Sequence, residues 1–425
     1  MENSRPATWL AFVVLLLAFP IGADAGEILR CGLTVPGRYI VVLAEHQSPW
    51  SRDVIPEEVF VKAQDLRIQY GGSIRHVYHS ALLGFAVGGL SEPEARILAS
   101  DHRVARVEED CILKPSAVQN YPPWELDRLD ERYLPLDQEY VYNRTGLGVH
   151  AYVLDFLIRS THQEFGGRVQ SRVDCTGVDP PSSGNCPPVP AGELIPHSHG
   201  TAVASKVGGS TLGVAKQVTL HSVKVCDDLD GEPGGPTDCF ASDVIAGVNY
   251  VKANRVNPAI ANISLNYAST RPDYFTAAFA LRSAIESTIT DGVSFTISAG
   301  NFNANACNYP PANVPAAIVV AGTTSSDSRW EESNFGSCVD LFAPALGITV
   351  ALRTSDTEIT NNASGTSFSA PLVAGVAALY LQGAPSATPA QVTNFILSWA
   401  TSGVVGDPQG SPNLLLFSRY GGLKN

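Results

Sequence analysis

The stretch Ser364-Gly365-Thr366-Ser367-Phe368-Ser369-Ala370-Pro371 leads directly into an apolar run, Val373–Leu379. The apolar run predicts a buried helix over Ser369–Leu381, and the small and hydroxyl residues before it predict the start of that helix. A serine at such a start is ordinarily an N-cap, and a proline is tolerated in the first turn. Taken alone, the stretch therefore indicates a capped helix, and it becomes a candidate site only if the chain supplies chemical partners for Ser367.

Outward from this helix, short apolar segments alternate with helical patterns. The predicted strands are Val149–Leu154, Val218–Val225, Ala259–Leu265, Val293–Ser298 and Ile318–Ala321, and the predicted helices are Thr201–Val207, Ala241–Asn254 and Phe275–Asp291. Near-continuous hydrophobic strands are typical of a parallel sheet that is buried on both faces. Residues 118–425 are therefore predicted to form an α/β domain with a mainly parallel sheet flanked by helices.

The region before it, residues 26–117, has a different pattern. A strand-like run at Arg38–Leu43 is followed by a helix, two strands and a second helix, and a last strand at Val104–Glu108 closes the series. This β-α-β-β-α-β order favours a small α+β, ferredoxin-like domain. In such an arrangement the last strand pairs antiparallel with the first, which would bring Cys111 near Cys31.

The start of the chain is predicted to be a secretion signal. Arg5 precedes an apolar run, Trp9–Phe19, and Ala23-Asp24-Ala25 offers the small residues that signal peptidase accepts. The alternative is a membrane anchor, but eleven apolar residues are short of the roughly 20 that span a bilayer. We therefore expect residues 1–25 to be removed, and the mature protein to be secreted without insertion into a membrane.

Secretion changes how the eight cysteines are interpreted. An even count in an oxidising compartment favours disulfides, and the lack of a Cys-x-x-Cys pair in the sequence argues against zinc. Cys175 with Cys186 and Cys226 with Cys239 would each close a short loop rich in Gly and Pro. Spacing alone leaves the connectivity open.

The charge of the chain argues against one class of partner. The sequence has 28 Lys+Arg against 41 Asp+Glu, a formal net charge of −13, and no basic stripe interrupts it. A phosphate backbone would find little to bind on such a surface, so we expect no nucleic-acid partner.

Two further segments place polar side chains at the end of a predicted strand and at the start of a predicted helix. In α/β proteins the catalytic and ligand-binding residues are usually found at these positions. The predicted strand 149–154 runs into Asp155, and the segment Ser198–Ala204 sets His199 at the opening of a helix of small residues. Taken alone, Asp155 is better explained as a buried carboxylate that caps a loop, and His199 as a histidine with a structural role. The chain order Asp155, His199, Ser367 is, however, one of the known orders of a catalytic triad.

Together the three segments resemble the sequences around the Asp, His and Ser of subtilisin-like serine proteases (the S8 family), with a spacing most like that of the proteinase K branch. Further matches lie in Gly213–Lys216, Val223–Val225, Ser264-Leu265, Ser298–Asn301 and Phe335–Pro344. The preceding region resembles the I9-type inhibitory propeptide of these enzymes, in Pro36–Val42 and Val107–Asp110. The resemblance implies a subtilisin-like fold and a secreted serine endopeptidase made as a self-processing zymogen, with its own propeptide as an intramolecular inhibitor.

The resemblance also implies a role for each site residue. Ser367 would attack the scissile carbonyl, His199 would take and return its proton, and Asp155 would hold the imidazole. Asn301 would donate its amide to the oxyanion. The walls that bind the substrate would be Ser264, Leu265 and Asn266 on one side and Ser298, Ala299 and Gly300 on the other. Because these walls are neutral or apolar, we expect protein or peptide substrates with a neutral or hydrophobic P1 residue, and a monomeric enzyme.

Several positions depart from the family pattern. Phe156-Leu157 stand where the family has a small hydroxyl residue and Gly, Ala202 replaces a second His, and Phe368 replaces a Met. Asn266-Tyr267 stand where a Gly-Gly pair lets the substrate backbone join as a strand. An alternative function therefore stays open, that of a catalytically silent secreted binding protein that retains its propeptide.

Structural sites follow from the same resemblance. A disulfide between Cys307 and Cys338 is expected, and the carbonyls of Pro315 and Ala317 with the carboxylate of Asp340 match positions that bind Ca²⁺ in related enzymes. The alternative for Asp340 is that it simply ends a strand. No cofactor is expected for catalysis.

Two processing sites are also expected. The segment Pro123–Arg128 resembles a Trp-containing segment that lies a few residues into mature proteinase K-like chains. Counting back from it by the same number of residues places propeptide cleavage between Ala117 and Val118. A small apolar P1 residue at this bond also suits neutral walls. Asn143 is the expected glycan acceptor, because it opens an Asn-x-Thr motif in a polar stretch before the first strand of the larger domain.

Overall fold

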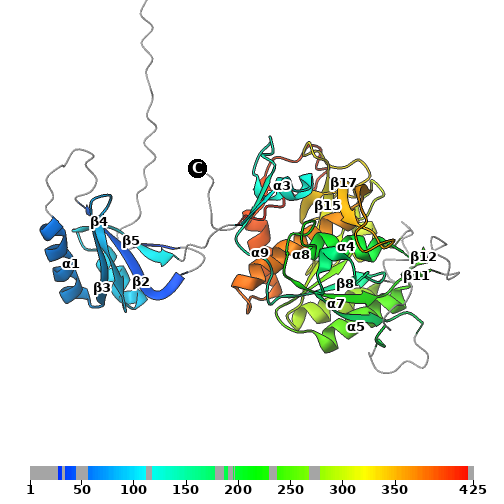
Figure 1. Cartoon of the computed structure of the whole chain (residues 1–425), viewed down its shortest axis with the longest axis horizontal. Helices are drawn as coiled ribbons and strands as arrows, with labels where there is room; N and C mark the ends of the chain where they lie inside the picture. The colour runs from blue at the N-terminus through cyan, green and yellow to red at the C-terminus, as the bar shows by residue number, and fades with distance from the viewer. Residues whose placement is uncertain are drawn as a thin grey trace, which may run out of the picture. The chain divides into compact units, whose positions relative to one another are not determined.

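The computed structural model of the chain describes residues 27–30, 34–44, 56–111, 117–177, 186–189, 195, 197–228, 237–267 and 278–419. They belong to two compact units, Met1–Leu113 and Lys114–Asn425 (Figure 1). The predicted signal, residues 1–25, lies outside the described residues. Among the helices of the described part, none is long and apolar enough to cross a membrane.

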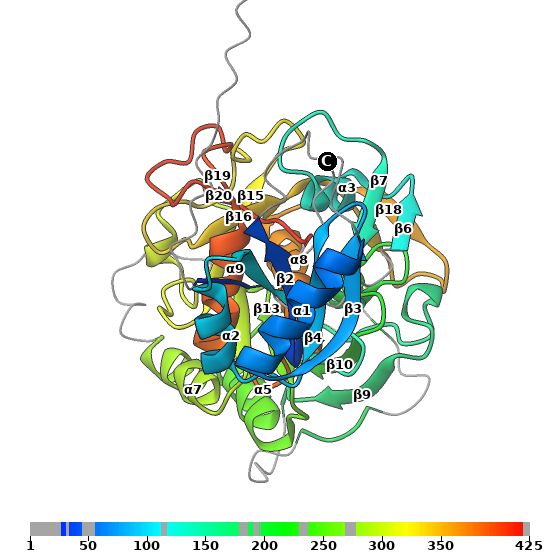
Figure 2. The ribbon, with the colours of Figure 1, turned by 90° about the vertical axis from the view of Figure 1, so that its left-hand side faces the viewer.

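The first unit is a five-stranded sheet with two helices. Its elements follow in the order β1 (Ile28–Leu29), β2 (Thr34–Leu43), α1 (Pro56–Tyr70), β3 (Ser73–His79), β4 (Leu83–Gly88), α2 (Glu92–Ala99) and β5 (Val104–Cys111). The sheet order is β1-β5-β2-β4-β3, and β5 pairs antiparallel with β2, as predicted. Figure 2 shows α1 and α2 on one face of the sheet, where Val41, Phe85 and Val107 contribute to the core. The predicted β-α-β-β-α-β order is confirmed, with β1 added parallel to β5.

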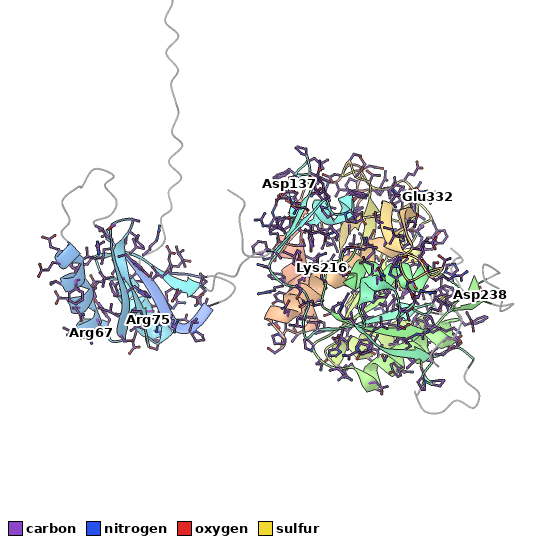
Figure 3. The ribbon with its side chains drawn as sticks, in the orientation of Figure 1. Arg67, Arg75, Asp137, Lys216, Asp238 and Glu332 are labelled. Carbon is purple, nitrogen blue, oxygen red and sulfur yellow. A yellow bond between two sulfur atoms is a disulfide. The ribbon has the colours of Figure 1, made fainter. Side chains whose placement is uncertain are left out.

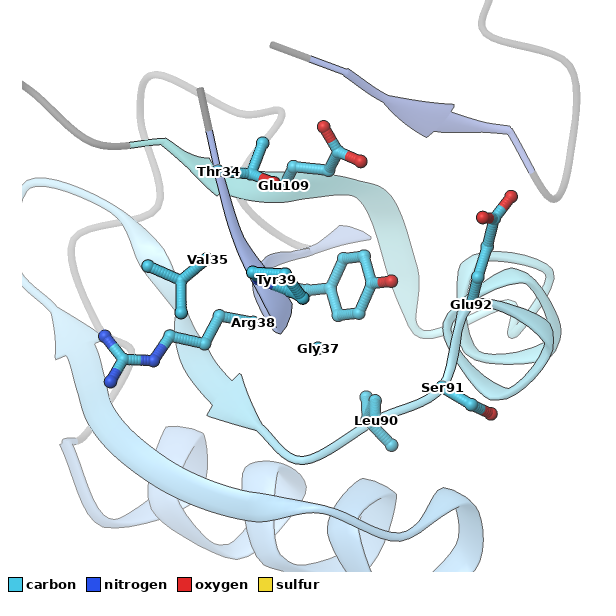
Figure 4. Close-up of a pocket in the computed structure, with 10 residues that line it drawn as sticks. Thr34, Val35, Gly37, Arg38, Tyr39, Leu90, Ser91, Glu92 and Glu109 are labelled. Carbon is cyan, nitrogen blue, oxygen red and sulfur yellow. The ribbon is translucent and has the colours of Figure 1, made fainter. Parts of the chain in front are cut away.

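A pocket of about 320 Å³ opens on this unit between the start of β2 and the start of α2 (Figure 4). It is lined by Thr34–Tyr39, Leu90–Glu92 and Glu109. Burial and the charges of Glu92 and Glu109 raise the pKa of the Tyr39 hydroxyl. Arg30 forms ion pairs with both carboxylates, so its single positive charge offsets one of their two negative charges.

The second unit is built on a nine-stranded sheet. From edge to edge its strands are β19 (Thr401–Ser402), β20 (Leu414–Leu415), β16 (Leu341–Pro344), β15 (Ile318–Thr323), β14 (Ser294–Ser298), β13 (Ala259–Ile263), β8 (His150–Asp155), β10 (Thr219–Lys224) and β9 (Val169–Asp174). All neighbours from β20 to β9 are parallel, and β19 joins β20 antiparallel. The five predicted strands are all present, with ends shifted by two residues at most. The prediction of a mainly parallel sheet is confirmed.

Helices cover both faces of this sheet (Figure 1). One hydrophobic cluster is shared by α4 (His199–Gly208), α8 (Thr366–Gly383) and α9 (Pro389–Trp399), and another is shared by α5 (Ala241–Asn254) and α7 (Phe279–Thr290). In β8, Ala151 and Val153 belong to the first cluster, whereas Tyr152 and Leu154 belong to the second. Successive side chains of a strand point to opposite faces, so β8 contributes to both cores.

The helix that carries Ser367 starts earlier than predicted. α8 begins at Thr366 rather than at Ser369, and its N-cap is Gly365, whose φ is 146°. Side chains rarely tolerate that backbone angle, so glycine allows the chain to turn sharply here. Ser367 therefore lies inside the first turn of the helix instead of capping it.

The described part of the second unit holds three disulfides, Cys175–Cys186, Cys226–Cys239 and Cys307–Cys338, which confirms those three predicted pairings. Cys111, the last residue of β5, is also disulfide-bonded. Its predicted partner, Cys31, lies outside the described residues, so that pairing stays a prediction.

Residues 117–120 join the second unit as a strand. β6 (Ala117–Asn120) pairs antiparallel with β7 (Glu139–Tyr142). The Gln119 side chain donates a hydrogen bond of 2.9 Å to the Thr211 carbonyl, in the loop that follows α4. The predicted cleavage bond between Ala117 and Val118 therefore lies in a paired strand.

Lys216 is buried, unlike charged residues such as Asp137 and Glu332, which are exposed on the second unit (Figure 3). Its ammonium group donates to the Gln119 side chain at 2.5 Å and lies 5.4 Å from the centre of the Tyr140 ring. Burial lowers the pKa of Lys216 to about 8. The hydrogen bond from Lys216 to Gln119 therefore holds β6 in place in addition to its pairing with β7.

Two buried ion pairs hold the next element, α3 (Trp124–Asp130). Lys206 of α4 donates to Glu125 at 2.6 Å, and both side chains are fully buried. Arg128 donates to both carboxylate oxygens of Asp327, at 2.7 and 3.0 Å. Because an unpaired buried charge is costly, these pairs tie α3 firmly to the rest of the unit.

Candidate active site

Asp155 and His199 meet at the carboxyl end of β8. Asp155 is the last residue of β8 and is fully buried, whereas His199 is the first residue of α4 and has 22% of its side chain exposed. His199 Nδ1 lies 2.8 and 2.9 Å from the two carboxylate oxygens of Asp155. An ionised carboxylate only accepts, so Nδ1 carries the proton and Nε2 presents a lone pair. The pair therefore has the geometry of an oriented general base.

The charge of Asp155 sets the basicity of His199. Burial disfavours the imidazolium ion, but the attraction of Asp155 and the hydrogen bond to it prevail, so the pKa of His199 is raised above its ordinary value. Asp155 Oδ1 also accepts the backbone N–H of Phe156 at 2.8 Å. That bond comes from the backbone, so it does not depend on the side chain that follows Asp155.

Three rings surround the imidazole of His199. The ring centroids of Phe368, His197 and Phe156 lie 6.0, 6.3 and 6.5 Å from that of His199. His197 also packs on Phe156 at 4.5 Å, and its Nδ1 accepts the backbone N–H of His199 at 3.1 Å. The sequence analysis did not identify His197. Its position two residues before His199 is the sequence feature that could have indicated it. The bulk of Phe156 packs against His197 and leaves the contact between Asp155 and His199 intact.

Ser367 lies in the first turn of α8 and exchanges hydrogen bonds with Ser264. Ser367 Oγ donates to the Ser264 carbonyl at 3.3 Å, and Ser264 Oγ donates to the Ser367 carbonyl at 2.8 Å. Pro371 explains the second bond, because it has no N–H to offer the carbonyl four residues earlier. The Ser367 hydroxyl therefore points to Ser264 here, and it has to turn before it can bond to His199.

The Asn301 amide is oriented by Thr366. Its Oδ1 accepts the Thr366 backbone N–H at 2.9 Å and the Thr366 hydroxyl at 2.7 Å. Because both bonds go to the oxygen, Nδ2 is the end of the amide left to donate elsewhere. The Thr366 hydroxyl in turn accepts the Gly300 N–H at 3.1 Å. Sequence reasoning did not identify Thr366, which has no local feature beyond its place at a helix start.

The two expected substrate walls lie at the ends of neighbouring strands. Ser264–Asn266 follow β13, and Ser298–Gly300 begin with the last residue of β14. The two strands are parallel, with Ile263 opposite Ile297. The first wall contacts Ser367, and the second contacts the preceding residue of α8. The structure therefore brings both walls to the first turn of α8, which carries the candidate nucleophile.

Asp340 lies immediately before β16 and faces β15 rather than ending a strand. Its Oδ2 accepts the Val319 N–H at 2.8 Å, and burial raises its pKa to about 6. Pro315 and Ala317 lie just before β15, in the same neighbourhood. Across the described ranges, no three His, Cys, Asp or Glu side chains form a metal-binding group. One carboxylate with backbone carbonyls is nevertheless a donor set that fits Ca²⁺, which prefers oxygen ligands.

Comparisons with known proteins identify the families to which the two parts of the chain are similar. The profile of the subtilase family matches residues 190–420, and that of the peptidase inhibitor I9 family matches residues 38–116. The chain is 42% identical to an extracellular serine proteinase of Thermus sp. (strain Rt41A), over 98% of this chain and 100% of the relative. It is 41% identical to alkaline serine exoprotease A of Vibrio alginolyticus, over 91% and 68%, and 31% identical to alkaline protease 1 of Aspergillus clavatus, over 95% and 96%.

A solved structure supports the same assignment. The crystal structure of a cold adapted subtilisin-like serine proteinase matches with a TM-score of 0.61 and 42% identity, covering 71% of this chain and 100% of that one. The resemblance inferred from the sequence, including the I9-type region and the expected secretion, is confirmed. This chain belongs to the subtilase family, as a secreted subtilisin-like serine protease that carries an I9 inhibitor domain.

Proposed function

We propose that this protease is an endopeptidase with Asp155, His199 and Ser367 as its catalytic triad and Asn301 as an oxyanion donor. The main support is the bonding of His199 Nδ1 to both oxygens of the buried Asp155. This contact fixes the tautomer that leaves Nε2 basic. Ser367 is the candidate nucleophile, because it lies in the first turn of α8 and the next residue, Phe368, packs beside His199.

The reaction begins when a bound substrate draws the Ser367 hydroxyl away from Ser264. Ser367 Oγ attacks the scissile carbonyl carbon while its proton passes to His199 Nε2, and the carbonyl oxygen gains the negative charge. Asp155 stabilises the imidazolium ion that forms. His199 returns the proton to the amine as the C–N bond breaks, and water then hydrolyses the acyl-enzyme by the same route.

Two donors would stabilise the negative oxygen of the tetrahedral intermediate. Asn301 Nδ2 is available because Thr366 holds the amide by its oxygen. The backbone N–H of Ser367 is the second donor, since N–H groups in the first turn of a helix have no partner within it. The positive end of the α8 dipole adds to both. Donors fixed before the reaction starts stabilise the transition state without a cost of reorganisation.

The contact between Asp155 and His199 supports activity more than silence, despite the departures from the family pattern. A catalytically silent protein would tolerate the loss of the contact between Asp155 and His199, yet this contact has two short distances. Phe156 supports Asp155 through its backbone and packs its ring on His197. The bulky residue after Asp155 is thus accommodated beside the triad.

Substrates are proposed to be proteins or peptides with a neutral or hydrophobic P1 residue. Residues 264–266 and 298–300 include no acidic side chain, so these walls offer nothing to pair with a P1 Lys or Arg. Ser298 and Ala299 of the second wall are fully buried. The mature enzyme is proposed to act as a monomer.

The I9 domain is proposed to inhibit the enzyme in the same chain until self-cleavage between Ala117 and Val118. That bond lies in β6, where Gln119 is held by Thr211, beyond the C-terminal end of α4. His199 is the first residue of α4, and the length of this helix places it roughly 14 Å from the C-terminal end of α4. β6 would therefore leave β7 to reach Ser367, and it would re-form after the cut.

Two stabilising features belong to the same proposal. A Ca²⁺ ion would be held by Asp340 and the carbonyls of Pro315 and Ala317. A glycan would be carried by Asn143, a half-buried residue in the loop that connects β7 to β8. Chelation of calcium should lower the Tm of the wild-type enzyme and leave the Tm of Asp340→Asn unchanged in differential scanning calorimetry. An equal shift in both proteins would contradict this site.

Incubation of the purified, processed protein with casein tests the proposed activity. We expect hydrolysis that a serine-directed inhibitor abolishes. A correctly folded and processed protein that hydrolyses neither casein nor a chromogenic peptide would instead favour the binding-protein alternative.

A further inference from the structure

Asn266 connects the two substrate walls. Its Nδ2 donates to the Ser298 carbonyl at 2.8 Å and to the Tyr309 carbonyl at 3.4 Å, and its Oδ1 accepts the Ser298 hydroxyl at 2.9 Å. Ser298 is fully buried and Tyr309 is buried. Three bonds to two buried residues hold the Asn266 side chain in one orientation, across the gap between the carboxyl ends of β13 and β14.

The position of this gap indicates which part of a substrate enters it. Ser264 begins the first wall and bonds to Ser367, and Gly300 ends the second wall beside the start of α8. A scissile carbonyl placed at Ser367 Oγ, with its oxygen toward Asn301, would direct the P1 side chain between the two walls. The Asn266 side chain bonds from the first wall to Ser298 of the second, so it would occupy the same space.

The surroundings of Asn266 resist rearrangement. The next residue, Tyr267, donates its backbone N–H to the Pro310 carbonyl at 2.8 Å, which ties the chain after Asn266 to the segment that holds Tyr309. The Tyr309 ring stacks on that of Phe302, with centroids 4.6 Å apart. Movement of Asn266 would therefore disturb a segment that is fixed at several points.

We propose that Asn266 forms the floor of the P1 pocket and restricts this protease to small P1 side chains, namely alanine, glycine and serine. The inference rests on the proposed function and narrows its substrate class. A P1 phenylalanine would have to displace Asn266, which would leave the buried polar groups of Ser298 unpaired. Unpaired buried groups are costly, so large side chains are rejected. The proposed maturation bond fits, because its P1 residue is Ala117.

Tetrapeptide p-nitroanilides that differ only at P1 test this proposal. We expect kcat/KM of the wild-type enzyme to be at least about tenfold higher with P1 alanine than with P1 phenylalanine. Asn266→Gly removes the side chain, so it should raise kcat/KM for phenylalanine by about tenfold or more and change that for alanine by less than about threefold. Ser298→Ala removes one of the three bonds and should shift the ratio in the same direction by a smaller factor.

Two results would overturn the proposal. One is a wild-type enzyme that cleaves after phenylalanine as efficiently as after alanine, and the other is a folded Asn266→Gly variant with an unchanged ratio. Asn254→Gly, at the exposed C-terminal end of α5, is the matched control and should keep the wild-type ratio. If Asn266→Gly fails to fold, Ser298→Ala decides by the same ratio.

A binding measurement separates this inference from the catalytic proposal. Peptides that end in a free carboxylate at P1 present no bond to hydrolyse there, so their binding to the protein freed of its I9 domain does not require activity. We expect peptides ending in alanine to bind at least about tenfold more tightly than peptides ending in phenylalanine, in a fluorescence titration. Equal binding would overturn the pocket inference alone, whereas selective binding without hydrolysis would overturn the catalytic proposal alone.

Discussion

Thr366→Val tests how Asn301, the proposed oxyanion donor, is held in place. Valine keeps the shape of the side chain but removes the hydroxyl that donates to Asn301 Oδ1 at 2.7 Å and accepts the Gly300 N–H at 3.1 Å. The backbone N–H of residue 366 still bonds to Asn301, so the amide loses one of its two anchors. Thr366 and Gly300 are both buried, so water does not readily replace the lost bonds.

The size of the effect follows from the strength of one hydrogen bond. Such a bond contributes about 0.5–1.5 kcal/mol. Because about 1.4 kcal/mol corresponds to a tenfold change in rate, kcat should fall by about two- to twelvefold. Asn301→Ala removes the donor itself and should lower kcat by about 10²–10³. KM should change little in both variants, because the oxyanion exists only in the transition state and the intermediate.

Steady-state kinetics with a chromogenic peptide measure these differences. Thr366→Ser keeps a hydroxyl at the same position, so it is the matched control and should stay within about twofold of the wild-type kcat, a difference below one weak hydrogen bond. Thermal unfolding shows whether each variant is folded. A wild-type kcat in Thr366→Val, or a drop in Thr366→Ser as large as that in Thr366→Val, would show that the hydroxyl does not position Asn301.

Two further substitutions probe the triad and the buried charges. Asp155→Asn removes the attraction that raises the pKa of His199. Because activity needs the neutral imidazole, the acid limb of the kcat/KM profile should move to lower pH, while kcat falls by about 10⁴. An acid limb that stays in place would show that Asp155 does not set this pKa. Lys206→Met leaves Glu125 buried without its cation, so the free energy of unfolding should fall by about 3–5 kcal/mol in denaturant titrations. Lys206→Met combined with Glu125→Leu should recover most of that loss, and a single variant as stable as the wild type would contradict the importance of the pair.

The parallel sheet could be predicted because most of its strands are rich in apolar residues. β8, β13 and β14 are buried at almost every position, and small polar residues such as Asn262, Thr296 and Ser298 are buried among the apolar ones. Their ends were less predictable. β13 stops at Ile263 rather than at Leu265, because the chain leaves the sheet there and Asn266 bonds to the Ser298 carbonyl instead of continuing the ladder. Apolar side chains continue past the last ladder pair, so the pattern does not mark the end of the strand.

The candidate triad could be predicted from local sequence, but the residues that hold the site could not. Thr366 lies 65 residues from Asn301 along the chain, and Asn266 lies 32 residues from Ser298. The bonds of Asn266 form because the parallel strands β13 and β14 bring its segment to Ser298, and those of Thr366 form because α8 begins near the end of β14. No local pattern encodes either contact. His197 was missed for a related reason, since its importance depends on a ring contact with Phe156 across the start of α4.

The identity of the nucleophile is tested most directly by covalent labelling of the processed protein with a fluorophosphonate. After digestion, mass spectrometry locates the labelled serine within the peptide that contains Ser364, Ser367 and Ser369. We predict that the label is on Ser367 alone, and that casein hydrolysis is lost in proportion to its incorporation. A label on another serine, hydrolysis that persists in fully labelled protein, or a folded protein that neither takes the label nor hydrolyses casein would contradict the proposed mechanism.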